Sequence, residues 1–121
     1  MAVEYAGTRH AFGRPIGSNQ GVAFALSDLA VKVENSHNLT YKAAHLRDLG
    51  RPSKRLAAMA KLYATEAAVD ATRVATQVFG GLGFSEELPL ARFYRDAKVL
   101  EIGEGTSEIQ KLVISRNILK D

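Results

Sequence analysis

Cysteine and tryptophan are absent from this sequence of 121 residues, and proline and histidine occur only three times each. Without cysteine the chain can form neither a disulfide framework nor a cysteine-ligated zinc site. The three histidines, His10, His37 and His45, lack the paired spacing of ligands on one helix face, so we expect no metal site. No segment reaches the roughly 18 apolar residues of a membrane span. We therefore expect no membrane partner, and a reducing, cytoplasmic location is permitted.

Positive charge exceeds negative charge by three, and much of it gathers in one window of the chain. This basic cluster sets a single acid, Asp48, among six cations: Lys42, Arg47, Arg51, Lys54, Arg55 and Lys61. A solvated surface is the favoured interpretation because charge alone is weak evidence for a ligand, and a phosphate-bearing ligand is the alternative. The window contains no Phe, Tyr or Trp for base stacking, so we expect no nucleic-acid partner.

Good helix formers dominate the interior of the chain, and strand-like alternation is hard to find. Apolar residues at helical spacing predict a long helix from near Ser18 to just before Gly50; they are Val22, Leu26, Leu29 and Val33. A second long helix is expected from Ser53 to Gly80, with an inward stripe of Leu56, Met59, Ala60, Tyr63, Ala67, Ala71, Val74 and Val78. Shorter helices are expected over 89–96 and 107–119. This pattern predicts an all-α, up-and-down helical bundle.

The N-terminal residues 2–6 have the pattern of the final turn and a half of a helix. A bundle built from these pieces lacks most of its first helix, so its inner apolar faces lie partly open. Exposed apolar patches of this kind usually recruit a partner. We therefore expect a homo-oligomer, a second polypeptide that covers the open faces, or a shortened chain.

The segment 99–110, VLEIGEGTSEIQ, places Glu104 between Gly103 and Gly105, directly before a helix start. Both glycines can adopt a positive φ or approach a ligand closely, so Glu104 can point where an ordinary loop residue could not. Ser107 and Gln110 have the spacing of a capping box, which predicts that the helix begins at Ser107. From this window alone, a solvated acid that suits the helix dipole is favoured over a functional carboxylate.

Two further windows contain arginines that suit an anion or a structural contact. In TRHAFG, residues 8–13, Arg9 offers a rigid fork of donors for a phosphate, or equally a cap for helix carbonyls. In RFYRDAK, residues 92–98, Arg95 and Asp96 are expected to form structural ion pairs and a helix-end cap.

A glycine-rich window, QVFGGLGF, covers residues 77–84. Gly80 is expected to end the preceding helix. A dinucleotide fingerprint is excluded because no strand precedes these glycines and Glu86 stands three positions after Gly83. A loop that a flat ligand approaches is the less favoured alternative to a simple turn.

Taken in order, four segments resemble the C-terminal helical domain of the acyl-CoA dehydrogenases: TRHAFGRPIGSNQ, MAKLYATEAA, QVFGGLGF and RDAKVLEIGEGTSEIQ. The resemblance extends from the first residues to about Leu119. Family members have an N-terminal helical domain, a middle β-barrel domain and a C-terminal four-helix bundle, with FAD held where they meet. The resemblance implies that residues 1–121 form one such C-terminal domain, without the N-terminal helical and middle β domains.

The resemblance also implies roles for individual residues. Glu104 matches the glutamate that takes the α-proton of an acyl-CoA thioester, and Gly105 matches the residue that leaves room for the substrate. Desolvation by a bound acyl chain makes such a carboxylate a stronger base. Thr106 and Glu108 match positions near the flavin. The residues that match contacts to the FAD of a neighbouring subunit are Arg9, Gln20, Gln77, Gly80 and Gly81.

Two functional hypotheses follow. In the first, the chain is the C-terminal portion of an FAD-dependent acyl-CoA dehydrogenase, which binds FAD weakly or not at all and is inactive without the missing domains. In the second, it is a non-catalytic, self-associating module derived from that family. Gly103 stands where many relatives have tyrosine, so the acyl-chain preference stays open.

Overall fold

The computed structural model describes residues 1–119, most of which are helical. This part of the chain contains six α-helices: α1 (Ala2–Thr8), α2 (Gln20–Asp48), α3 (Lys54–Phe79), α4 (Gly81–Phe84), α5 (Leu90–Leu100) and α6 (Ser107–Ile118). Between α1 and α2, the two-residue strands β1 (His10–Ala11) and β2 (Arg14–Pro15) pair antiparallel and are followed by a 3-10 turn, η1 (Ile16–Ser18). The predicted all-α class is confirmed.

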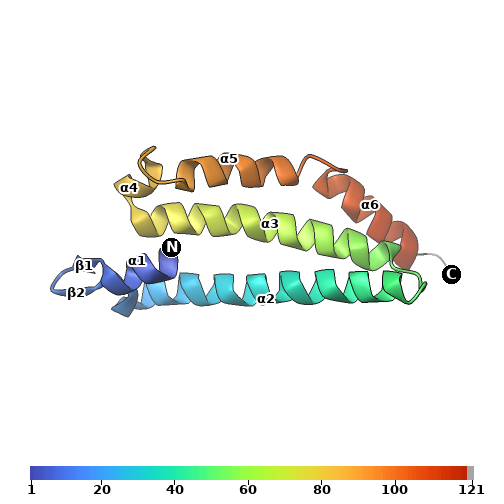
Figure 1. The fold of residues 1–121 in the computed structure, drawn as a ribbon, viewed down its shortest axis with the longest axis horizontal. Helices are drawn as coiled ribbons and strands as arrows, with labels where there is room; N and C mark the ends of the chain where they lie inside the picture. Colours follow the sequence, from blue (N-terminus) through green and yellow to red (C-terminus); the bar gives the residue numbers. More distant parts are fainter. Residues whose placement is uncertain (120–121) are drawn as a thin grey trace.

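Helix α3 is central, with α2 along one side and α5 along the other (Figure 1). Consecutive long helices run in opposite directions, which confirms the up-and-down topology expected of a bundle. Helix α6 packs against the first half of α3, whereas α1, the hairpin and α4 gather at the other end of the molecule. None of the helices in the described part of the chain is long and apolar enough to cross a membrane.

Small side chains form most of the buried interior. The buried apolar residues are Ala6, Ala43, Ala58, Ala60, Val74, Phe79, Leu90 and Ala97. Alanine lets neighbouring helices approach closely, but it encloses little apolar surface. Many large apolar side chains are exposed instead, including Phe24 at 59% and Ile102 at 59%. The apolar faces of the bundle are thus partly open, as the sequence predicted.

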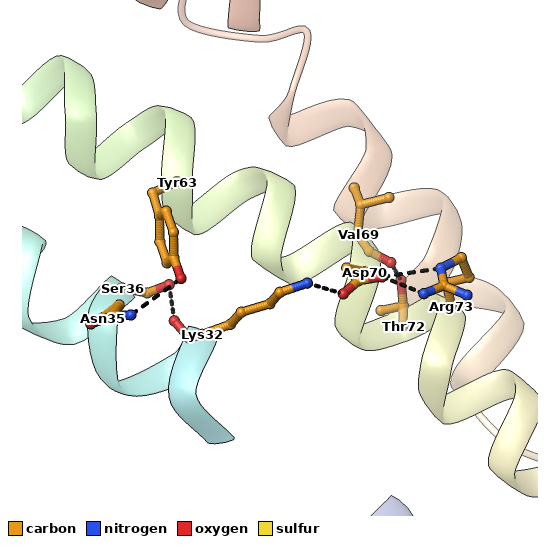
Figure 2. A network of polar contacts seen from close by, with 8 residues as sticks. All are labelled: Lys32, Asn35, Ser36, Tyr63, Val69, Asp70, Thr72 and Arg73. Carbon is orange, nitrogen blue, oxygen red and sulfur yellow. Dashed lines mark hydrogen bonds and ion pairs between the residues drawn. The ribbon is translucent and has the colours of Figure 1, made fainter. Parts of the chain in front are cut away.

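The face of α2 that packs on α3 departs from prediction at one position. Three of the expected apolar residues are half-buried: Val22, Leu26 and Leu29. Val33, however, is 48% exposed. Lys32 turns toward α3 instead, because its ammonium pairs with Asp70, which also accepts two hydrogen bonds from the guanidinium of Arg73 at 2.6 and 3.0 Å (Figure 2).

The structure departs from the sequence-based expectations at two places. The hairpin was not predicted because strands of two residues are too short to show an alternating pattern. Helix α5 continues to Leu100, so Asp96 lies inside the helix and does not cap its end. Among residues 1–119, neither Arg95 nor Asp96 forms an ion pair. The expected end of α3 is confirmed, since Gly80 follows its last residue with φ of 61°.

Candidate functional site

Glu104 lies on the turn between α5 and α6, here called the Glu104 turn and comprising residues 101–106. Its backbone φ is 55°, and that of Gly105 is 91°. Of the two glycines that allow a positive φ here, Gly105 adopts one, and Glu104 itself also adopts the left-handed conformation. A residue other than glycine rarely does so, and it costs on the order of 1 kcal/mol or more unless its surroundings hold it there. The Glu104 side chain is exposed.

Hydrogen bonds from α6 hold the Glu104 turn. The Gln110 amide donates to the Gly105 carbonyl at 3.1 Å and to the Glu104 carbonyl at 3.3 Å. The backbone N–H of Ser107 donates to the Glu101 carbonyl at 3.0 Å and closes the turn. These bonds connect the start of α6 to both sides of Glu104.

A lysine that the sequence placed in the basic cluster also belongs to this site. Lys61 on α3 donates from Nζ to the Gly105 carbonyl at 2.7 Å. The other five cations of the basic cluster are exposed near the α2–α3 connection: Lys42, Arg47, Arg51, Lys54 and Arg55. Sequence reasoning missed the contact of Lys61 because 44 residues separate it from Gly105.

Helix α6 begins at Ser107, as predicted, but its N-cap is Thr106 and not Ser107. The Thr106 Oγ1 accepts from the backbone N–H of Ile109 at 3.3 Å. The Ser107 hydroxyl is buried and has no hydrogen-bond partner within the described residues. The predicted capping box is thus wrong, because the Ser107 N–H already bonds to Glu101 and the Gln110 side chain bonds to the turn carbonyls instead.

Glu108 lies in the exposed first turn of α6. Its own backbone N–H and the Thr106 hydroxyl stabilise the carboxylate and hold the pKa of Glu108 below its usual range. The helix N-terminus favours negative charge in the same way. Glu104 and Glu108 therefore place two carboxylates beside the start of α6.

Exposed apolar side chains lie within the Glu104 turn and on either side of it along the chain. They are Val99, Leu100, Ile102, Ile109 and Leu112, with exposures between 41% and 59%. A ligand or a protein surface that covered the turn together with these side chains would also remove water from Glu104. The surface thus suits an apolar partner more than a free anion.

The remaining candidates lie at the opposite end of the bundle, here called the hairpin end (Figure 1). These candidates are all exposed: Arg9, Gln20, Gln77, Gly80 and Gly81. Gln77 lines a cavity of about 530 Å³ together with Phe12, Asn19 and Arg73. A Cβ placed on Gly80 or Gly81 would have no neighbour within 4 Å, so the backbone there is open to a flat ligand.

The structure therefore divides the predicted site residues into two groups. Glu104, Gly105, Thr106 and Glu108 lie together, and the other five lie at the hairpin end. On α3, Lys61 contacts the first group and Gln77 belongs to the second. Their separation by sixteen residues corresponds to about 24 Å of helix. In the described residues, no three His, Asp or Glu side chains gather in a way that could hold a metal ion.

A family model and a curated relative both match nearly the whole chain. Residues 1–119 match the family model described as acyl-CoA dehydrogenase, C-terminal domain. The mitochondrial short-chain specific acyl-CoA dehydrogenase of Rattus norvegicus is 48% identical over 119 residues, which are 98% of this chain and 29% of that protein.

Solved structures show the same relationship. The chain matches butyryl-CoA dehydrogenase from Megasphaera elsdenii with a TM-score of 0.96 and 44% identity, over 98% of this chain and 31% of that one. A chain from a structure described as the electron transferring flavoprotein of Acidaminococcus fermentans matches with a TM-score of 0.97 and 41% identity, over 99% and 32% of the two chains.

The chain thus spans less than a third of the length of these three proteins. Members of the family are FAD-dependent, bind acyl-CoA and form oligomers. The family match covers nearly the whole chain and includes both groups of candidate residues. The chain therefore belongs to the acyl-CoA dehydrogenase family and corresponds to its C-terminal helical domain.

Proposed function

We propose that this chain serves as the C-terminal portion of an FAD-dependent acyl-CoA dehydrogenase and supplies Glu104 as the catalytic base. The conformation of Glu104 carries this proposal. A left-handed glutamate with an exposed side chain, on a turn tied to two helices, is a costly way to build an ordinary surface loop.

The proposed reaction is the α,β-dehydrogenation of an acyl-CoA thioester. The Glu104 carboxylate takes the α-proton, and the electron pair of that C–H bond forms the new Cα=Cβ bond as the β-hydrogen leaves as a hydride. The chemistry that FAD would supply when bound is acceptance of this hydride. The Glu104 backbone N–H helps to polarise the thioester carbonyl, and Gly105 leaves room for the substrate. The apolar side chains beside the turn help to exclude water, which makes the carboxylate a stronger base.

The residues of this chain fit a flavin as one wall of its site. The hairpin end contains exposed Arg9, Gln20 and Gln77 and the open backbone of Gly80 and Gly81. The separation of about 24 Å along α3 from the Glu104 turn favours a site shared between chains. Thr106 and Glu108 would then lie near the flavin of their own subunit, and the hairpin end would contact that of a neighbouring subunit.

One wall leaves most of a cofactor in water, so we infer that the 121-residue polypeptide alone binds FAD weakly and is inactive. We propose that residues 1–121 form a single domain. The other walls come from further protein, joined to this chain or separate, that contributes an N-terminal helical and a middle β domain. We further propose that the protein forms a homo-oligomer and is located in the cytoplasm.

The decisive experiment is Glu104→Gln in an enzyme assembled from this chain and a polypeptide that supplies the other domains. We expect turnover to fall by about 10³-fold or more while acyl-CoA binding is retained, because the amide is isosteric but takes no proton. Glu87→Gln is the matched control, since Glu87 is exposed in the loop before α5. Undiminished turnover of the Glu104→Gln variant would refute the proposal that Glu104 is the catalytic base.

A second candidate function is a non-catalytic, self-associating module. The exposed large apolar side chains favour it, since monomers rarely leave such extensive apolar surface open. Light scattering and flavin absorbance of the purified chain test this alternative. A colourless oligomer whose assembly with the other domains produces no turnover supports the module. Stoichiometric FAD that acyl-CoA bleaches would contradict it, and a clean monomer would exclude self-association.

A further inference from the structure

The Gly105 carbonyl accepts hydrogen bonds from two different helices. Lys61 Nζ on α3 donates to it at 2.7 Å, and Gln110 Nε2 on α6 donates at 3.1 Å. A carbonyl oxygen has two lone pairs, so these two donors meet its full capacity. The peptide unit between Gly105 and Thr106 is therefore fixed from both sides.

The adjoining peptide unit is held by the same glutamine. Gln110 Nε2 also donates to the Glu104 carbonyl at 3.3 Å, and a Cβ on Gly105 would lie 2.8 Å from that nitrogen. The amide thus lies directly against the left-handed segment. Unfavourable backbone conformations persist only where neighbouring groups over-determine them, and Lys61 and Gln110 are the side chains that do so here.

Lys61 is a half-buried cation whose observed hydrogen bond goes to a neutral carbonyl and not to a carboxylate. The ion pairs within residues 1–119 involve Lys32, Arg73, Lys98 and Lys111, but not Lys61. Its ammonium is directed at a neutral carbonyl. A charged donor strengthens that hydrogen bond, and partial burial protects it from competition by water.

We propose that Lys61 and Gln110 are positioning residues that set the direction of the Glu104 carboxylate. The inference rests on the proposed function, in which Glu104 is the base. Neither residue touches a reacting atom, since both bond to backbone carbonyls. Lys61 also fixes the turn to α3, the helix that carries Gln77 at the hairpin end, so the base and the flavin wall share one rigid support.

The first test uses hydrogen exchange in the 121-residue chain and needs no cofactor. The backbone N–H of Ser107 bonds to Glu101 across the turn and reports whether the turn is closed. We expect Lys61→Met to accelerate exchange at Ser107 by about tenfold while amides in the middle of α2 stay protected. Lys61→Arg, which keeps a charged donor, should restore protection. Lys111→Met is the matched control, because Lys111 is 59% exposed and lies 3.8 Å from Glu66.

The second test uses the assembled enzyme. We expect Lys61→Met to lower kcat by about tenfold with less than a twofold change in KM, because the base is misdirected while substrate contacts remain. In a Glu104→Gln background the same change should cause no further loss, since Lys61 acts only through Glu104. Gln110→Met should behave like Lys61→Met and provides a second variant if one fails to fold.

The outcomes separate the two proposals. Wild-type exchange at Ser107 and wild-type kcat in Lys61→Met would overturn the positioning role while leaving Glu104 as the base. Full activity of Glu104→Gln, together with faster exchange in Lys61→Met, would overturn the proposed function and the catalytic purpose of the contact. An equal loss from Lys61→Met in both backgrounds would show that Lys61 acts by another route.

Discussion

The Glu104 turn and the hairpin end contain candidate residues that are held in different ways. At the Glu104 turn, side chains from α3 and α6 fix the two backbone carbonyls that follow the Cα of the proposed base. At the hairpin end, Arg9, Gln20 and Gln77 are exposed, and their side chains make no hydrogen bond to a described residue. A proton-transfer group needs a fixed direction, whereas a cofactor wall can be ordered when its ligand arrives. The comparison predicts unequal sensitivity to mutation in the two regions.

The largest effect is expected when an equivalent glycine is replaced in each region. Gly105 (φ 91°) and Gly13 (φ 80°) both have positive φ, but an added Cβ would lie 2.8 Å from the Gln110 amide at Gly105 and have no close neighbour at Gly13. Gly105→Ala should cost about 2–3 kcal/mol, and Gly13→Ala about 1–2 kcal/mol from backbone strain alone. Urea unfolding of both variants measures the difference. Equal losses of unfolding free energy in the two variants would show that crowding at Gly105 adds nothing to the backbone strain.

The next effect concerns the start of α6. Thr106→Ala should cost about 1 kcal/mol because it removes the hydroxyl that accepts from Ile109. Ser107→Ala should be neutral or slightly stabilising, since the Ser107 hydroxyl is buried without a partner among residues 1–119. Thermal unfolding compares the two variants. A larger loss of stability in Ser107→Ala than in Thr106→Ala would show that Ser107 is the N-cap of α6.

A smaller, pH-dependent effect is expected between the two regions, where Lys32 joins α2 to Asp70 on α3. Hydrogen bonds from Lys32 and then Arg73 hold the pKa of Asp70 below its usual value, and Asp70 raises that of Lys32. Asp70→Asn should cost about 1 kcal/mol or less at pH 7, because both partners are partly exposed.

That contribution from Asp70 is fully present above its unfolded-state pKa of about 4 and is lost as the pH falls through the lower folded-state value. The destabilisation caused by Asp70→Asn should therefore shrink on acidification below about pH 4. A set of urea titrations between pH 3 and pH 7 measures it. A difference that stays constant across this range would contradict the assignment.

The smallest effect on stability is expected at the hairpin end. Gln77→Ala should change the free energy of unfolding by less than about 0.5 kcal/mol, because the side chain is exposed. If the hairpin end contacts a flavin, the assembled enzyme should nevertheless lose FAD more readily. Fluorescence of released flavin measures this, with Gln20→Ala as a companion variant. If both variants retain FAD as well as the wild type does, the proposal that the hairpin end contacts the flavin is wrong.

The long helices were predictable because their signals are local. The stripe on α3 and the glycine at its end lie within a few residues of the positions that they determine, and α3 ends at Phe79 as expected. The cap of α6 was misplaced by one residue because Thr106 and Ser107 both offer a hydroxyl. Which of them faces the helix amides depends on how Ser107 bonds to Glu101 across the turn.

The site was predictable in part. The motif made Glu104 the candidate base and placed beside it two glycines that allow a positive φ, but it did not indicate that Glu104 itself adopts a positive φ. Lys61 appeared only as one member of a basic cluster. Its partner lies 44 residues away, and no pattern within α3 indicates that contact.

By itself, the sequence determined the helical class, the order of the long helices, the family and the choice of Glu104 as the candidate base. Helical periodicity and motif spacing depend on neighbouring residues, so a linear sequence contains them. Only the tertiary structure decided that Lys61 holds the Glu104 turn and that the two groups of candidate residues lie at separate places along α3. Those arrangements depend on how α2, α5 and α6 pack around one central helix, which brings together residues that are far apart in the chain.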